Sequence, residues 1–483
     1  MPARRFPVLA KLAAVGAVLL GLVLALQTVS DVVAERQGRL REAEASVAAS
    51  LAGNQTLVGP LLARECVESW DVVVGEGKDR KTVTERRSRT LVAVPASLEI
   101  ASDATLEPRH RGIYVVNAYA LKARLVAAWT DGLALQAERE HAGSRLECEA
   151  PAMFVALGDA RGVRQASVKL DGTSVPVLAG TTHAAHPRGF HADVAPAYVG
   201  ARAPLRAEVE LALAGTGDLS FAPAAERTQV TLASDWPHPS FGGRFLPVER
   251  EVSERGFHAR WQLNALATTA PQAAAAGARA CSLGDADPEG PAPSARADRR
   301  GCIETFGVAF FDPVSPYVLA DRATKYGLLF IALTFAGVGG VEVLRRLRVH
   351  PVQYGLVGAA LAIFFLLLVS LSEHVPFAAA YAVAAAACTL LLGFYGAFVL
   401  KGRRAGLLFG LGIAVLYGVL YALLQLEQTA LLLGSVLLFA TLAALMVATR
   451  RIDWYALTAR VAPDAGAPAV PAASPSGPTS AAG

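Results

Sequence analysis

Histidines in the first half of the chain are the side chains best suited to hold a metal ion, because imidazole is a common zinc ligand. The four in question are His183, His186, His191 and His238. Their spacing fits no closed pattern of cysteine and histidine ligands, and the glycines and prolines near them are typical of turns. We therefore predict solvated or structural histidines, and neither a metal nor a cofactor.

Other patterns that could bind anions, calcium or an acyl group are incomplete. Gly215-Thr216-Gly217-Asp218 lacks the lysine and the following helix of a phosphate-binding loop, which favours a tight turn between strands. Asp285, Asp287 and Glu289 lack the glycine and distant glutamate of a calcium loop, which favours solvated surface. The sequence has no Gly-x-Ser-x-Gly elbow and no recognisable Ser/His/Asp arrangement. It therefore predicts a protein that is not an enzyme.

The most distinctive turn sequence is Trp236-Pro237-His238-Pro239. Proline fixes the backbone φ angle, and the Trp236 ring can anchor the turn by burying a large apolar area. Two interpretations stay open for Trp236 and His238, a recognition surface or a packed corner of a domain. The packed corner is favoured, because buried aromatic side chains usually serve packing.

Glu373 and His374 are the most interesting ionisable residues among the apolar segments, because they follow the end of a long apolar stretch. A carboxylate beside an imidazole could there sense pH, contact lipid headgroups or dock a neighbouring domain. A hydrated helix end is the simpler alternative. Asp321, Arg322 and Lys325 precede another apolar stretch that should begin at the same membrane face. We hypothesise that this ring of charges couples an external domain to the membrane helices.

The composition places these residues in a membrane protein. Of 483 residues, 53% are hydrophobic and only 18% are charged, and the mean hydropathy is +0.39. Such a chain is too apolar for an ordinary soluble enzyme. The net charge of +4 excludes a disordered chain and disfavours nucleic acid as a partner.

Six apolar stretches predict six membrane-spanning helices, because a helix of about 20 residues crosses the hydrocarbon core. They are Val8–Leu26, Tyr326–Val341, Pro351–Ser372, Val375–Leu400, Ala405–Leu426 and Gln428–Thr449. The second has 16 residues between Lys325 and Glu342, so we expect charges that snorkel at its ends. The first could be a cleaved signal peptide, but its length favours a retained anchor.

Basic residues at alternate connections predict the orientation, because lysine and arginine near span ends stay on the cytoplasmic side. The basic groups are Arg4, Arg5 and Lys11; Arg345, Arg346 and Arg348; Lys401, Arg403 and Arg404; and Arg450 and Arg451. The other short connections contain Glu373 with His374, and Glu427, and neither lysine nor arginine. Both termini should then be cytoplasmic, with residues 30–325 on the far side of the membrane.

These arguments predict a membrane α-helical bundle of six transmembrane helices with a large β-rich domain outside the cytoplasm, which the family resemblance given below makes a periplasmic domain. Residues 1–29 would form the cytoplasmic N-terminus and the first anchor, and residues 30–325 the external domain, with a flexible loop near 265–300. Residues 326–450 would form a five-helix bundle, and residues 451–483 a disordered cytoplasmic tail. The two flexible segments are rich in alanine, glycine and proline and would bury too little apolar surface to become ordered.

Alternating apolar residues indicate β-strands in the external region, most clearly over Leu205–Leu213. Similar runs occur at Thr90–Val94, Ile113–Tyr119, Ser167–Leu170, Val230–Leu232 and His258–Leu263. Their spacing favours one or two antiparallel sandwich-like units. Ser30–Leu51 instead contains helix-forming and charged residues, so we expect it to continue the first membrane helix outward.

Cysteine usage agrees with an oxidising compartment, because an even number of cysteines lies in the external region. These are Cys66, Cys148, Cys281 and Cys302, whereas Cys388 lies within a predicted span. Four cysteines allow three pairings. We favour Cys281 with Cys302, which would close the alanine-rich loop, and leave the other pair open.

Several short motifs, in the same order over nearly the whole chain, resemble the CreD (Cet) family of bacterial inner-membrane proteins. They are Leu57-Val58-Gly59-Pro60, Gly158-Asp159-Ala160-Arg161-Gly162, Gly215-Thr216-Gly217-Asp218-Leu219-Ser220, Ser234-Asp235-Trp236-Pro237-His238-Pro239-Ser240-Phe241, Asp321-Arg322-Ala323-Thr324-Lys325-Tyr326, His350-Pro351 with Gln353-Tyr354, Ser372-Glu373-His374 and Ile452-Asp453-Trp454-Tyr455. The resemblance implies a multi-pass inner-membrane protein with a large periplasmic domain. It also implies an association with a two-component envelope response and with colicin tolerance when abundant, and no known enzyme activity.

Three classes of function follow, and the sequence favours a non-enzymatic envelope protein that contacts membrane lipids and possible periplasmic or inner-membrane protein partners. A transporter or lipid-handling protein is the alternative, and it would need a polar cavity at mid-membrane. The third class, a periplasmic enzyme, would need a cleft with clustered acid, base or metal groups. Against the transporter, the ionisable groups between Pro351 and Thr449, apart from Cys388 and tyrosines, all fall in predicted connections. Gly406 and Gly410 should instead allow close helix packing within the bundle.

Overall fold

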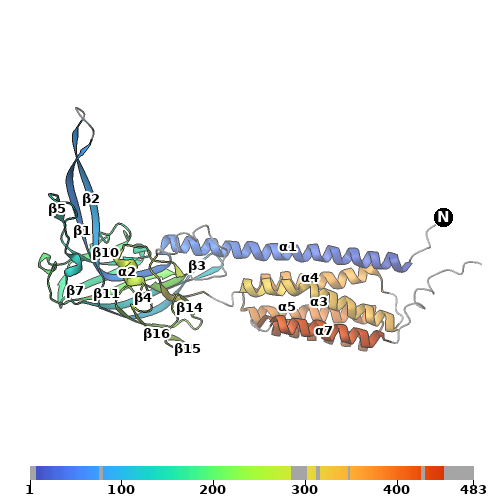
Figure 1. Ribbon diagram of the computed structural model, residues 1–483. Coiled ribbons are helices and arrows are strands. Elements are labelled where there is room, and N and C mark those ends of the chain that lie inside the picture. Colours follow the sequence, from blue (N-terminus) through green and yellow to red (C-terminus); the bar gives the residue numbers. More distant parts are fainter. Residues whose placement is uncertain are drawn as a thin grey trace, which may run out of the picture. The chain divides into compact units, whose positions relative to one another are not determined.

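The computed structural model describes residues 7–74, 80–283, 302–311, 316–345, 349–425 and 430–450. The chain divides into two compact units. A helical unit combines residues 1–37 with 314–483, and a β domain comprises residues 38–313. Figure 1 shows the helices of the first and the sheets of the second. Helix α1 is continuous through residues of both units.

Long helices make up the helical unit. They are α1 (Pro7–Ser50), α3 (Pro316–Arg345), α4 (Pro351–Ser372), α5 (Phe377–Val399), α6 (Arg403–Gln425) and α7 (Ala430–Thr449). Five of them, α1 and α3 to α6, are long and apolar enough to cross a membrane. The structure therefore has one candidate span before the β domain and four after it. Helix α7 coincides with the sixth predicted span, which stays a prediction.

The predicted start of the second span was wrong. Helix α3 begins at Pro316 rather than near Tyr326, and its candidate span of 27 residues runs to Glu342. Proline suits the first turn of a helix, and Lys325 lies 2.7 Å from Asp321 one turn earlier on the same helix. The charges expected to precede the helix thus lie on it. Counting apolar residues alone missed this charged beginning.

Small residues let the membrane helices approach closely. A Cβ atom on Gly406 of α6 would lie 2.5 Å from the Ala397 Cα of α5, and one on Gly410 would lie 3.2 Å from the Gly393 Cα. A Cβ on Gly358 of α4 would lie 2.1 Å from a methyl carbon of Leu22 on α1. The prediction that Gly406 and Gly410 pack within the bundle is confirmed, and α1 is part of the same packed core.

Two sheets form the β domain, which confirms the prediction of a large β-rich domain. The nine-stranded sheet contains β1 (Gln55–Val74), β2 (Lys81–Ala93), β5 (Arg145–Cys148), β6 (Ala152–Leu157), β9 (Leu178–Ala179), β10 (Gly189–Asp193), β12 (Asp218–Phe221), β14 (Ser240–Gly243) and β17 (Phe306–Ala309). The eight-stranded sheet contains β3 (Ser97–Arg111), β4 (Tyr114–Trp129), β7 (Val163–Leu170), β8 (Thr173–Val175), β11 (Leu205–Thr216), β13 (Arg227–Ser234), β15 (Glu249–Ser253) and β16 (Gly256–Asn264). Most strand pairs are antiparallel, but β1 with β12 and β3 with β13 are parallel.

Side chains from both sheets share one hydrophobic core. Strand β11 shows the predicted alternation, because Leu205, Val209 and Leu213 are buried in this core whereas Arg206 and Glu210 are exposed. The period of two therefore identified the inner face of this strand correctly.

The alanine-rich segment was wrongly excluded from every core. Helix α2 (Ala270–Ala275) buries Ala270 and Ala274 almost completely, against side chains such as Leu61 and Phe154 of the nine-stranded sheet. Alanine has no bulk to hold a helix away from a sheet, so a short apolar helix can lie close to it. Residues 284–300 of the predicted loop, with Asp285, Asp287 and Glu289, lie outside the described residues.

The four cysteines of the β domain form two disulfides. The disulfide Cys281–Cys302 confirms the favoured pairing and links the chain after α2 to the chain before β17. The disulfide Cys66–Cys148 joins β1 to β5. Cys388 is free and buried in α5. Several other predictions concern residues outside the described ranges, namely Arg4, Arg5, Arg346, Arg348, Glu427, Arg451, Trp454, Tyr455 and the tail to residue 483.

Candidate functional site

Polar contacts tie helix α1 to its surroundings, and the first cluster of them contains the predicted residue Glu373. The Arg36 Nε of α1 lies 3.2 Å from the Glu373 Oε1 at the C-terminus of α4, and the Glu373 side chain is only 10% exposed. The Gln37 amide donates a hydrogen bond to the Tyr317 carbonyl of α3. An arginine is a favourable partner for a carboxylate at a helix C-terminus, where the helix dipole is negative.

The predicted ring of charges is therefore only partly assembled. His374 is exposed, and its Nδ1 faces the Ser370 carbonyl at 3.2 Å. Asp321 pairs with Lys325, and Arg322 is half-buried on α3. Sequence reasoning missed the partner of Glu373, since Arg36 is far from it along the chain.

The second cluster joins α1 to α3 and α4. Glu342 accepts hydrogen bonds from the Lys11 ammonium, from the Val349 N–H at 3.2 Å and from the Tyr354 hydroxyl at 2.9 Å. Lys11 and Arg36 are 25 positions apart on one helix, which corresponds to about 37 Å. The two clusters thus hold α1 at separate levels of the helical unit. A lone charge in an apolar stretch needs a partner, and that rule could have predicted the pairing of Lys11.

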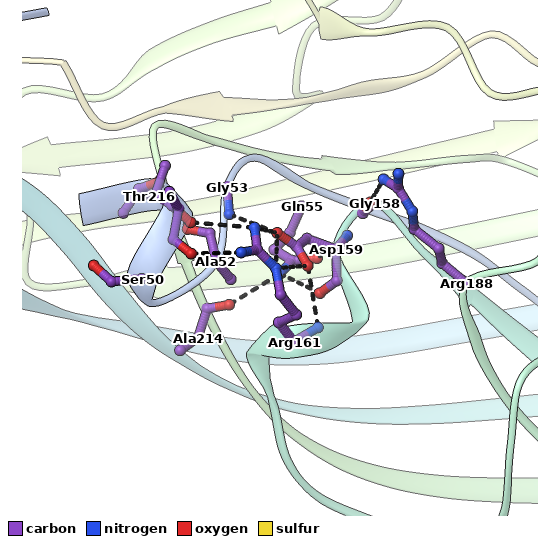
Figure 2. A network of polar contacts seen from close by, with 12 residues as sticks. Ser50, Ala52, Gly53, Gln55, Gly158, Asp159, Arg161, Arg188, Ala214 and Thr216 are labelled. Atoms are coloured by element: carbon purple, nitrogen blue, oxygen red, sulfur yellow. Dashed lines mark hydrogen bonds and ion pairs between the residues drawn. The ribbon is translucent and has the colours of Figure 1, made fainter. Parts of the chain in front are cut away.

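The third cluster holds the C-terminus of α1 to the β domain (Figure 2). The Arg161 guanidinium donates hydrogen bonds to the Ala49 carbonyl at 2.5 Å and to the Ala48 carbonyl at 3.3 Å. Carbonyls in the last turn of a helix lack partners within the helix, and a cation there also complements the dipole. Arg161 is therefore a side-chain cap for α1.

Asp159 orients this arginine. Its carboxylate accepts hydrogen bonds from Arg161 Nε at 3.0 Å and Nη2 at 2.6 Å, and from the Gly53 N–H at 3.1 Å just beyond α1. The Arg161 guanidinium, with smaller contributions from the two backbone N–H groups of Gly53 and Arg161, lowers the pKa of Asp159 to about 2, and the Asp159 carboxylate raises the pKa of Arg161.

Gln55, which is completely buried, completes the same junction in Figure 2. Its amide donates to the Asp159 carbonyl at 2.9 Å and the Ala214 carbonyl at 3.0 Å, and accepts from the Asp159 N–H. The Thr216 hydroxyl donates to the Ala52 carbonyl. A Cβ on Gly162 would lie 2.1 Å from the Ala214 carbonyl oxygen, so only glycine lets these two backbone segments lie so close together.

Two of the motifs that carry the family resemblance meet at this junction. Residues 158–162 supply Asp159 and Arg161, and residues 215–220 supply Thr216. Nothing in the sequence indicated that the two motifs act together, because they are far apart along the chain. They meet only in the folded structure, around the end of α1.

The predicted turn at Trp236 is a packed corner with one exposed residue. The Trp236 indole donates a hydrogen bond to the His238 carbonyl at 2.7 Å, and the ring packs against the sandwich core while the His238 side chain is exposed. The neighbouring Asp235 accepts a hydrogen bond from the Leu106 N–H of β3. Recognition by Trp236 and His238 stays a prediction.

Two of the four candidate metal ligands are structural residues in the interior. His183 and His186 are 6% and 8% exposed, and both rings stack against Phe154. Burial lowers the pKa of His183, and burial together with the neighbouring His183 lowers that of His186 to about 4. His191 contacts the Gly180 carbonyl instead. Among the residues that the structure describes, no group of three or more His, Cys, Asp or Glu side chains could hold a metal ion.

The helical unit and the β domain each contain a described cavity. A gap among α3, α4, α5 and α6 has a volume of only about 20 Å³ and is lined mainly by apolar side chains, with Gln353 as an exception. The β domain has a larger groove, of about 570 Å³, on the outer face of the eight-stranded sheet. Its lining mixes alanines with the exposed charges Asp103, Lys122 and Glu210.

Candidate membrane spans on both sides of a large β domain define a multi-pass membrane protein. The family model described as inner membrane protein CreD matches residues 7–455, so the chain belongs to the CreD family of inner-membrane proteins. It is similar to the inner membrane protein CreD of Escherichia coli (strain K12), with 36% identity over 450 residues that cover 92% of each chain. The resemblance inferred from the motifs is confirmed.

One solved structure gives a partial match. It is the crystal structure of a Legionella pneumophila protein proposed to be a nutrient binding protein, with 7% identity and a TM-score of 0.21. The match covers 35% of this chain and 65% of that one. A similarity of this size carries no argument about fold or function.

Proposed function

We propose that this inner-membrane protein is not an enzyme and contributes to cell-envelope integrity or an envelope stress response by coupling its β domain to its membrane helices through α1. The observation that carries the proposal is the pattern of ties along one continuous helix of 44 residues. Lys11 and Arg36 bind acidic partners in the helical unit, and Arg161 caps the last turn in the β domain. A helix held by such contacts near both ends could transmit a displacement from one end to the other.

In this proposal the β domain is periplasmic, both termini are cytoplasmic and α7 is the sixth span. Basic residues at alternate connections support this orientation. The two disulfides of the β domain suit an oxidising compartment. Alkaline phosphatase, which is active only outside the cytoplasm, should be active when fused after Arg202 and inactive when fused after Lys401. The reverse pattern would exclude the orientation.

The role in the envelope can be tested by colicin tolerance, which the family resemblance implies for abundant protein. We expect overproduction of the wild-type chain in Escherichia coli to confer tolerance. Arg161→Ala should reduce it towards the level of the empty vector without changing the amount of protein in the membrane. Arg255→Ala removes an exposed arginine in a turn of the β domain and should leave tolerance intact. Equal tolerance in the two variants would contradict the proposal.

Residues predicted from the sequence give a second test in the helical unit. We propose that Glu373 acts through its ion pair with Arg36, and that Arg322 and His374 contribute to the same end of the unit. Replacement of Glu373, His374 and Arg322 together should abolish tolerance, and the charge exchange Arg36→Glu with Glu373→Arg should restore part of what either single change loses. Wild-type tolerance in the triple variant would remove these residues from the account.

A further inference from the structure

The β domain carries an exposed ribbon of two strands, here called the arm, formed by residues 67–74 of β1 and 81–88 of β2. The strands pair from Val67 with Ser88 to Val74 with Lys81. All eight β2 residues of the arm are exposed. Figure 1 shows the hairpin of β1 and β2 projecting from the rest of the β domain.

A buried carboxylate and a disulfide clamp the base of the arm. Cys66 of β1 is bonded to Cys148 of β5. The Glu68 carboxylate accepts hydrogen bonds from the Ser144 hydroxyl at 2.5 Å and from the Glu140 and His141 N–H groups at 3.0 and 2.9 Å. These hydrogen bonds, led by that of Ser144, lower the pKa of Glu68 to about 2. The loop is thus held firmly against β1.

Side chains of both strands extend the clamp. The Trp70 ring stacks on the His141 ring with 3.7 Å between their centroids, and Arg87 and Arg89 bind Glu140 at 2.9 and 2.8 Å. An isolated hairpin of two strands is only marginally stable in water. The clamp therefore gives the arm an orientation and a stiffness that its own strands would not provide.

Beyond the clamp the arm offers unpaired strand edges. Among the strands that the structure describes, β2 pairs only with β1, and β1 beyond Ser69 pairs only with β2. Val73, Val74 and Val83 are 58%, 52% and 47% exposed near the far end. An exposed edge with free backbone N–H and C=O groups recruits further strands.

The charge of the β2 edge indicates what could bind there. Arg80, Lys81 and Arg86 are exposed, and the acidic Asp71 already accepts a hydrogen bond from Thr84. Only Glu85 opposes this positive charge on the far part of β2. Pairing with the same edge of a second copy would bring two edges of net positive charge together, which is unfavourable. The complementary partner is an acidic strand.

We propose that the β2 edge of the arm binds an extended acidic segment of a partner protein, which adds a strand beside residues 81–88. Backbone hydrogen bonds would provide the register, and the basic side chains would select acidic sequences and speed the encounter. The exposed valines would give the added strand an apolar contact. The inference concerns the β domain alone and holds or fails independently of colicin tolerance.

The test uses the full chain in detergent micelles and a fluorescein-labelled peptide, Thr-Glu-Val-Glu-Val-Glu-Thr, followed by anisotropy. We expect saturable binding that weakens with added salt. A peptide with lysines for glutamates should not bind. A third peptide keeps the glutamates but has prolines for valines, so it has the same charge and cannot pair as a strand; it should bind on the order of tenfold more weakly, or not at all.

Two double variants localise the site. Lys81→Glu with Arg86→Glu should weaken binding of the acidic peptide on the order of tenfold or more, because two favourable charges become repulsive. Arg250→Glu with Arg255→Glu makes the same charge change at exposed positions elsewhere in the β domain and should have little effect. With diamide added as the oxidant, which takes up the two electrons and two protons of the two thiols, a Thr82→Cys variant should form a disulfide with a cysteine-containing acidic peptide.

Four results would overturn the inference. They are equal binding of the proline peptide, equal loss in both double variants, no binding of the acidic peptide, and arm-dependent cross-linking of two copies of this chain. The first would indicate charge attraction without strand pairing, and the last would make a second copy the occupant. Circular dichroism of each variant would show whether the β domain is retained.

Discussion

The helical unit and the β domain hold the same helix by different means. In the helical unit, where the surroundings of α1 are apolar, Lys11 and Arg36 each meet a carboxylate of another helix. In the β domain, the end of α1 is held by hydrogen bonds to backbone carbonyls, organised by Asp159, Arg161 and Gln55. Charge is costly in a membrane, so few ion pairs are used there, whereas backbone groups in the β domain need partners.

The largest expected effect concerns packing in the helical unit. Gly406→Leu would force a side chain against the backbone of Ala397, and overpacking of this kind costs about 3 kcal/mol. Gly412→Leu is the matched control on the same helix, because a Cβ there would have no neighbour within 4 Å. We expect a clear fall in the thermal midpoint in detergent for Gly406→Leu only. Similar midpoints for both variants would contradict the packing of α5 on α6.

The second effect concerns the junction in the β domain. Arg161→Ala removes the cap of α1 and leaves the Asp159 carboxylate without its main partner, so the last turn of the helix should open more often. Hydrogen exchange of the full chain should become faster for residues 42–56 and remain unchanged in α5 and α6. Unchanged protection around Ala48 and Ala49 would show that the guanidinium contributes little to the end of the helix.

The third effect depends on pH. His183 and His186 have pKa values below the usual value, that of His186 about 4, because they are buried. In the unfolded chain the two histidines regain their usual pKa, so they take up protons at a higher pH than in the folded chain. The β domain therefore loses stability as the pH falls from about 6.5 towards 4. For His186 this amounts to on the order of 1 kcal/mol between pH 7 and 5. His186→Phe should flatten the pH dependence of β domain unfolding, followed by tryptophan fluorescence, and an equally steep profile would contradict this assignment.

The smallest effect distinguishes the half-buried ion pair of Arg36 with Glu373 from an exposed pair in the same helical unit. Lys325 pairs with Asp321 on α3 but is 70% exposed, and such pairs contribute about 0.5 kcal/mol or less. Asp321→Asn should leave the thermal midpoint nearly unchanged, whereas Glu373→Gln should lower it measurably. A larger loss from Asp321→Asn would reverse the relative importance of the two pairs.

The sequence predicted the membrane helices well because their information is local. The predicted span Pro351–Ser372 has the same bounds as α4, and Val375–Leu400 differs from α5 by three residues in total. The length of an apolar stretch determines such a helix directly. Only the charged beginning of α3 was missed, since it has no apolar signature.

The structure of the β domain was harder to predict, because residues that are far apart in the sequence make its contacts. Individual strands such as β11 were found from their alternation, but the parallel pairing of β3 with β13 leaves no local trace. The junction depends on Arg161 meeting Ala48 and Ala49 across more than a hundred residues. The arm was missed too, since its exposed β2 residues have no apolar alternation.

The most direct test of coupling through α1 lies at Gly38, where the two units divide within the helix. A side chain there would meet no neighbour within 4 Å, so Gly38→Ala should preserve or strengthen the helix. Gly38→Pro should kink or break the helix between the contacts of Arg36 and those of Ala48 and Ala49. If α1 transmits between them, the proline variant loses colicin tolerance at normal membrane abundance and the alanine variant keeps it. Full tolerance in the proline variant would contradict the account.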